Sequence, residues 1–272
     1  ALSREAFVSL ISLADPADAD PASELAEAPG PLTRARMYAA IEASPSPAAQ
    51  AEAIGLTLAS SDDVLVRWAM ARLYREALLG LDIDPALGPH ASSFALALLA
   101  AGEIDAGGRW ATSAPPGAPA DLTTPAPGAP AKPLDAAAFA KLMHQLLAGQ
   151  PISDAAGEPT RDMKVLLAVA GGADLPVQPE ASLLADEPVL VAPVLRAALL
   201  SASFGGRIGE AGLAAALSLG RDDLGATPLP ALVDTIAALR IVGLERHARL
   251  IAFEAMWARW LEAEALRPED EA

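Results

Sequence analysis

Short stretches in which a helix-forming segment ends in glycine, and an alanine-rich segment follows at once, recur along this chain. Gly102, Gly206 and Gly243 each stand at such a point, and Gly172 stands at a fourth. Glycine tolerates the left-handed backbone conformation that ends one helix and turns the chain into the next. The recurrence predicts helical hairpins, which either stack as a solenoid or pack as an irregular bundle.

The composition supports an all-α fold. Hydrophobic residues make up 53% of the 272 residues, aromatic residues make up only 4%, and much of the hydrophobic fraction is alanine. Alanine is the strongest helix former and has little side chain to bury, whereas the aromatic and β-branched runs that favour strands are scarce. We therefore expect helices that approach one another closely, with small side chains at their contacts.

The chain is strongly acidic along its whole length. Its formal net charge is −16, from 35 acidic and 19 basic residues, and residues 1–112 and 113–272 each carry −8. Nucleic acids and anionic membrane surfaces are bound through clustered lysine and arginine, which this sequence lacks. We therefore expect no nucleic-acid partner, while a basic protein partner is compatible with the charge.

The sequence contains no cysteine, which excludes disulfide frameworks, thiolate metal sites and cysteine nucleophiles. Its most apolar stretch, residues 189–204, contains Pro193 and Arg196 and is too short to span a bilayer, and no signal-peptide pattern is present. We therefore expect a soluble protein without membrane insertion.

Arginine used in place of lysine, with abundant alanine, glycine and proline, is typical of a GC-rich bacterial genome. The expected compartment is thus bacterial cytoplasm or periplasm.

A proline-rich segment divides the chain. Residues 113–133 contain seven prolines, which oppose helix and strand and favour extended backbone. We predict a linker or long loop here, between an N-terminal helical region, residues 1–112, and a C-terminal helical-repeat region, residues 134–272. If the two regions stack on each other, the segment would instead be a loop along one solenoid.

Capping residues and prolines predict where individual helices begin. In the N-terminal region the expected starts are Ser3, Asp20, Gly30, Ser46, the run 61–63, and Ser92 or Ser93. In the C-terminal region they are Asp135, Thr160, Asp186, Ile208, Pro230 and Leu244. The last of these helices is expected to run to about residue 266 and to be long for a hairpin.

The spacing of the glycine turns gives the C-terminal region a repeat. Gly206 and Gly243 are 37 residues apart, the glycine turn before them lies 34 residues earlier, and Ala248 and Ala255 follow Gly243 at five and twelve residues. With this period and these small residues, residues 172–266 resemble the tetratricopeptide repeat, a helix–turn–helix unit. The resemblance implies a concave surface that binds a peptide or another protein. An irregular helical bundle is the alternative.

No motif for catalysis or metal binding is present in the sequence. The histidines, His90, His144 and His247, stand alone rather than at the paired spacing of zinc ligands. The acidic clusters lack the ligand spacing of a calcium loop, and Asp62 and Asp222 are better placed to cap helices. We therefore predict no catalytic residue, no cofactor-binding residue and no metal site.

Candidate partner-binding residues come from the tryptophans, since three of the four directly follow an arginine and both residue types are enriched at interface hot spots. The candidates are Trp257, Trp260, Arg259, Trp110 and Arg109. Core filling is the alternative role for the rings. We therefore expect a non-enzymatic module that binds a protein or peptide, with the oligomeric state left open. The alternative is an all-α enzyme or small-ligand sensor whose inter-helical pocket holds one of the histidines.

Overall fold

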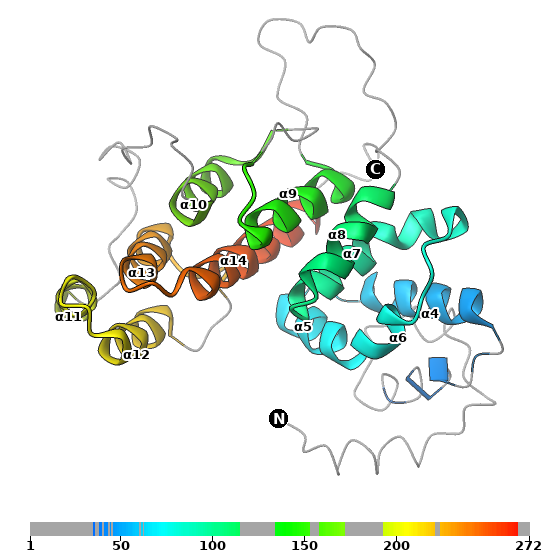
Figure 1. Cartoon of the computed structure of the whole chain (residues 1–272), viewed down its shortest axis with the longest axis horizontal. Helices are drawn as coiled ribbons and strands as arrows, with labels where there is room; N and C mark the ends of the chain where they lie inside the picture. Colours follow the sequence, from blue (N-terminus) through cyan, green and yellow to red (C-terminus); the bar gives the residue numbers. More distant parts are fainter. Residues whose placement is uncertain are drawn as a thin grey trace, which may run out of the picture. The chain divides into compact units, whose positions relative to one another are not determined.

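The chain is helical and forms two compact units, residues 1–115 and residues 116–272 (Figure 1). The computed structural model describes residues 35, 38, 39, 41, 42, 44, 46–59, 61, 63–114, 134–152, 158–171, 193–220 and 224–265. These residues contain helices and no β-strand, which confirms the predicted all-α fold. The predicted helix starts at Ser3, Asp20, Gly30 and Asp186, the Gly172 turn and nearly all of the proline-rich segment lie outside the described residues.

The N-terminal unit contains five described α-helices and one 3₁₀ segment. They are α4 (Pro47–Ala59), α5 (Val64–Leu73), α6 (Arg75–Leu79), η2 (Pro85–His90), α7 (Ala91–Ala100) and α8 (Ile104–Ser113). The predicted caps explain two of the starts. The Ser46 hydroxyl accepts a hydrogen bond from the Ala49 amide at 3.2 Å, and Asp63 Oδ1 accepts one from the Leu65 amide at 2.8 Å. The carboxylate that caps α5 is therefore that of Asp63, next to the predicted Asp62.

Two helices of this unit differ from prediction in their bounds. The helix expected to begin in the run 61–63 is interrupted at Tyr74, whose backbone leaves helical geometry (φ −89°, ψ 3°) and whose side chain is buried. The next helix begins at Ala91 rather than after Ser92 or Ser93, with His90 at the cap position. The cause is the 3₁₀ segment, because Asp84 Oδ1 accepts from the Ala86 amide at 2.8 Å and starts helical turns earlier.

The centre of the N-terminal unit is α7, which packs on α8, α5, α4 and α6. Every residue from Phe94 to Ala100 is buried. The ring of Phe94 meets Trp110 of α8 edge-on, with centroids 5.1 Å apart and an interplanar angle of 83°. Gly107 of α8 lies directly over Leu99, because a Cβ atom at Gly107 would sit 2.7 Å from Leu99 Cγ. Close approach of α7 and α8 therefore depends on this glycine.

Burial of Tyr74 predicts that the N-terminal unit loses stability in alkali. Desolvation raises the pKa of its phenol well above the usual value near 10. In the unfolded chain the phenol ionises at about pH 10, so the unfolded state binds fewer protons above that pH and stability falls as pH rises. Denaturant unfolding measured between about pH 9 and 11.5 should show this decline.

The matched control is Tyr74→Phe, in which stability should depend less on pH over the same range. Since the chain has only two tyrosines, the phenolate absorbance that the variant lacks reports the titration of Tyr74. Tyr38 remains in both proteins, and its pKa is also raised, first by burial and then by the charge of Glu42. A wild-type stability as flat with pH as that of the variant would contradict the prediction.

The C-terminal unit contains six described α-helices. They are α9 (Ala136–Ala148), α10 (Arg161–Gly171), α11 (Pro193–Phe204), α12 (Ile208–Leu219), α13 (Leu229–Ile241) and α14 (Glu245–Ala265). The predicted cap of α9 is confirmed, since Asp135 Oδ1 accepts from the Ala138 amide at 2.7 Å. The longest described helix is α14, in agreement with the prediction.

The predicted glycine turns at Gly102, Gly206 and Gly243 are confirmed, with φ values of 87°, 65° and 82°. In each, the amide after the glycine donates to the carbonyl five residues back, as in the Schellman motif. These bonds are Glu103 to Leu98 at 2.8 Å, Arg207 to Ala202 at 2.9 Å and Leu244 to Leu239 at 2.8 Å. The same closure thus ends helices in both units and joins α7 to α8, α11 to α12, and α13 to α14.

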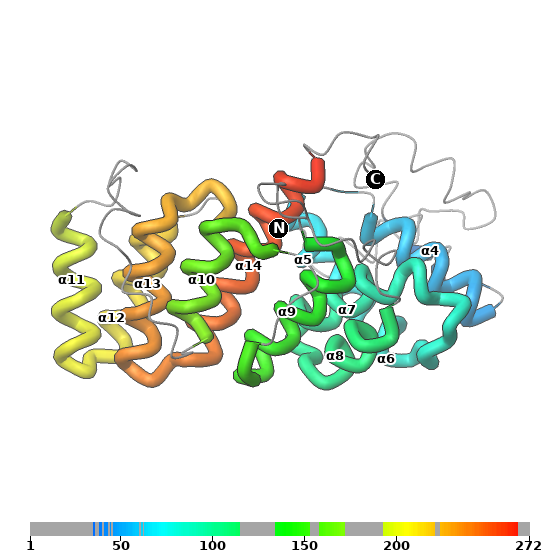
Figure 2. The backbone as a smooth tube through the Cα atoms, turned by 90° about the horizontal axis from the view of Figure 1, so that it is seen from above, coloured from blue at the N-terminus to red at the C-terminus, as the bar shows by residue number. Residues whose placement is uncertain are grey.

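The helices of the C-terminal unit pack in succession (Figure 2). Helices α9 and α10 lie against α14, α13 packs on both α10 and α14, and the α11–α12 hairpin packs chiefly on α13. Ala248, Ala252 and Ala255 of α14 are fully buried, as expected for small residues at a helix–helix contact. The hairpin of α11 and α12 therefore forms one end of the described stack.

Candidate functional site

The tryptophans predicted to bind a partner are core residues in the structure. Trp110, Trp257 and Trp260 are all buried. Trp260 stacks on Phe139 with centroids 4.9 Å apart and planes 5° apart, while Trp257 packs against Phe253 at 5.5 Å. None of the three rings is exposed for a partner to contact, so their position fits core filling rather than the expected anchoring of a partner.

The arginines beside those rings differ in their surroundings. Arg259 forms an ion pair with Asp162 and donates to the Thr227 carbonyl at 2.7 Å, so its guanidinium joins α14 to α10 and to the turn before α13. Arg109 lies exposed on α8 of the other unit. The guanidinium of Arg259 therefore bonds to groups within the C-terminal unit, and Arg109 belongs to the N-terminal unit.

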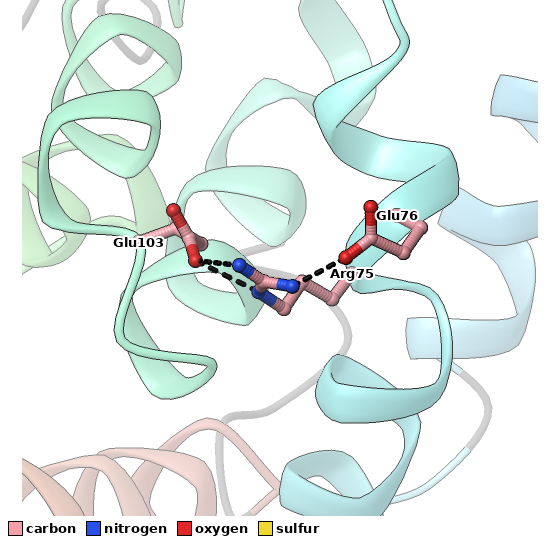
Figure 3. Close-up of polar contacts among 3 residues, drawn as sticks. All are labelled: Arg75, Glu76 and Glu103. Atoms are coloured by element: carbon pink, nitrogen blue, oxygen red, sulfur yellow. Dashed lines mark hydrogen bonds and ion pairs between the residues drawn. The ribbon is translucent and has the colours of Figure 1, made fainter.

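The polar cluster around Arg75 also joins helices (Figure 3). Arg75 Nε donates to Glu103 Oε1 at 2.7 Å, and the same guanidinium forms an ion pair with Glu76. The hydrogen bond and charge of Glu103 raise the pKa of Arg75. Since Glu103 is the residue before α8, the cluster holds α6 to the α7–α8 turn. All three side chains are partly or largely exposed, so we assign this cluster a structural role.

The three histidines belong to three different helical segments, η2, α9 and α14. His90 packs against Gly55, where a Cβ atom would sit 2.4 Å from His90 Nδ1. His144 is half-buried on α9 and His247 is exposed on α14. Within the described residues, no group of three or more histidine, aspartate or glutamate side chains is arranged to hold a metal ion.

An open groove of about 390 Å³ lies among α10, α13 and α14. Its lining residues are Val169, Ala237, Arg240, Ile241 and Glu245. Arg240 Nη1 donates to the Val169 carbonyl at 2.6 Å and so satisfies one carbonyl at the C-terminal end of α10. None of the lining residues is a histidine, so this groove lacks the histidine expected of a catalytic or ligand-sensing pocket.

The largest exposed apolar side chains of the C-terminal unit gather on the α11–α12 hairpin. Val194 and Phe204 of α11 are 77% and 76% exposed, and Leu213 of α12 is 64% exposed. We define the hairpin face by the exposed apolar residues Val194, Phe204, Ile208, Leu213 and Leu217. Large exposed apolar side chains on one hairpin are candidates for an interaction site, so the hairpin face is the candidate functional site.

The sequence of α12 explains why it is apolar on both sides. Ala211, Ala214 and Ala215 are buried, and they share one side of the helix at three- and four-residue spacing. Leu213 and Ala216 lie on the opposite side and are exposed. A helix that is apolar all round is normally covered all round. In the described structure α12 is covered on one side only.

The hairpin face carries almost no net charge. Residues 193–220 contain only three charged side chains, Arg196, Arg207 and Glu210. Arg196 Nε pairs with Asp234 Oδ2 at 2.6 Å, and Arg207 Nε pairs with Glu210 Oε2 at 2.9 Å. In a chain with a net charge of −16, this hairpin is a neutral surface whose flanking charges are already paired.

Comparison with known proteins adds no family or function. Neither models of protein families, nor characterised proteins, nor solved structures gave a match to this chain. Among the described helices, none combines the length and apolar character needed to cross a membrane.

Proposed function

We propose that this protein is a non-enzymatic interaction module, built from helical hairpins, that binds a protein or peptide partner through the hairpin face. The observation that carries the proposal is the exposed apolar side of α11 and α12 at the end of the described stack. Stacked helical hairpins require a polar outer side at their ends to stay in solution. An apolar end is therefore best explained by a partner that covers it.

The turn geometry supports the same proposal. Hairpins closed by Gly206 and Gly243, with Ala248 and Ala255 fully buried after the second turn, are what the resemblance to tetratricopeptide repeats leads us to expect. Proteins built from such hairpins use their surfaces to bind other proteins. The proposal moves the binding residues from the buried tryptophans to the exposed leucines of α12.

The test is site-specific cross-linking from the hairpin face. A photoreactive phenylalanine analogue placed at Leu217 should cross-link one protein species in cells that express the chain. The matched control is the same analogue at Leu65, which is 50% exposed on α5 of the N-terminal unit and should not cross-link that species. Equal cross-linking from both positions, or none from Leu217, would overturn the proposal.

A further inference from the structure

We propose that the partner at the hairpin face is a second copy of this chain, packed through α12 about a two-fold axis. This inference rests on the proposed function, because it names the partner of the same surface. Closed two-fold dimers are the commonest oligomers, and they require a patch that is complementary to itself.

Charge restricts where two copies of this chain can meet. Each copy carries a net charge of −16, so most pairings of its surface place like charges together, which is unfavourable. The hairpin differs, because residues 193–220 carry two arginines and one glutamate. Its exposed centre is apolar, and Arg196, Arg207 and Glu210 all have partners within their own chain. Two hairpin faces can therefore meet without bringing unpaired acidic groups together.

The spacing on the exposed side of α12 is that of a helix–helix seam. Gly209, Leu213 and Ala216 of α12, and Gly220 at its C-terminal cap, follow one another at four, three and four residues, the spacing of seam positions in paired helices. If two α12 helices meet antiparallel, Leu213 lies level with Ala216 of the second copy, and Gly209 lies level with Gly220 of the second copy. Each layer thus pairs leucine with alanine or glycine with glycine.

Small residues leave the room that such a pairing needs. A Cβ atom added at Gly209, Gly212 or Gly220 would meet no atom within 4 Å. The backbone of a second α12 could therefore approach closely at both ends of the seam. Leu213 and Leu217, both more than half exposed, would then be buried against the second copy.

The size of the face sets the expected strength of the dimer. A helix of twelve residues is about 18 Å long and about 10 Å wide with its side chains, so α12 presents roughly 180 Å² in projection. A standard interface buries about 800 Å² per partner. We therefore expect a reversible dimer with a dissociation constant on the order of micromolar or weaker.

Sedimentation equilibrium of the full chain tests the inference. Between roughly 1 and 200 µM the average mass of the wild type should rise toward twice that of the chain. The double variant Leu213→Glu/Leu217→Glu should remain monomeric, with self-association weakened roughly 100-fold or more by the buried like charges. Both positions are exposed, so circular dichroism should show an unchanged fold. Leu65→Glu is the matched control and should dimerise like the wild type.

A charge-reversal experiment isolates contact between copies. The variant Leu213→Lys/Leu217→Lys should also be monomeric alone, whereas an equimolar mixture with the glutamate variant should regain association. Dimerisation of the glutamate variant alone, or no association in the mixture, would overturn the inference. A wild type that stays monomeric, while position 217 cross-links a different protein, would reject self-association and leave the proposed function intact. A monomer without any cross-linked partner would reject both.

Discussion

Replacing Trp260 with alanine is expected to lower the free energy of unfolding of the C-terminal unit by about 3–5 kcal/mol. The indole is only 9% exposed, stacks on Phe139 and donates to the Leu134 carbonyl at 3.2 Å. The variant removes the ring from the contact between α9 and α14 and leaves the buried Leu134 carbonyl without this donor. Denaturant unfolding followed by circular dichroism measures the loss.

The variant Trp260→Phe is the control that separates the two contributions. A phenylalanine ring retains contact with Phe139 but cannot donate to the Leu134 carbonyl, so the expected cost falls to about 1 kcal/mol. An alanine variant as stable as the wild type would contradict the packing described for α9 and α14. Partner binding lost at unchanged stability would instead restore Trp260 as a binding residue.

Replacing Gly107 with alanine is expected to destabilise the N-terminal unit by about 1–3 kcal/mol, although alanine is the better helix former by about 1 kcal/mol. The added Cβ atom would lie 2.7 Å from Leu99 Cγ and 3.1 Å from the Ala95 carbonyl oxygen. Leu99 is fully buried, so its side chain has little space to move away. Thermal or denaturant unfolding of the variant measures the cost.

The matched control is Gly80→Ala, in the same unit. Gly80 has an ordinary right-handed backbone conformation, with φ −79°, and its added Cβ atom would lie 3.4 Å from the nearest atom. The expected change in stability is within about 0.5 kcal/mol. A Gly107→Ala variant that is at least as stable as Gly80→Ala would show that α7 and α8 do not depend on the absent side chain.

The parts of the fold that depend on local chemistry could be predicted from the sequence. A carboxylate or hydroxyl before a helix caps it wherever the rest of the chain goes, as Ser46 and Asp135 do. Glycine at a helix end behaves in the same local way, as Gly206 and Gly243 show. The break at Tyr74 could not be predicted in this way, because it accompanies burial of a ring that stacks on Tyr38, a distant residue.

The candidate site was harder to predict because exposure is decided by tertiary packing. Trp257 and Trp260 have the residue type of an interface anchor, but burial against neighbouring helices places them in the core. Leu213 and Leu217 have the spacing of core residues, but α12 has neighbours chiefly on its alanine side. The sequence did contain one signal of the exposed apolar surface. Residues 193–220 hold only three charged side chains, too few to make the outer faces of both α11 and α12 polar.

The hydrogen bond from Trp260 to Leu134 joins residues 126 positions apart, and this separation bears on synthesis of the chain. Helix α9 leaves the ribosome with the ring of Phe139 uncovered, and α14, which carries the Trp260 that stacks on it, follows more than a hundred residues later. At about 5–20 residues per second this delay lasts roughly 6–25 s. Helices α7 and α8 are separated only by the Gly102 turn, so they can pack together as soon as both have been synthesised. Of these two contacts, the one between α9 and α14 therefore leaves apolar surface uncovered for longer during synthesis.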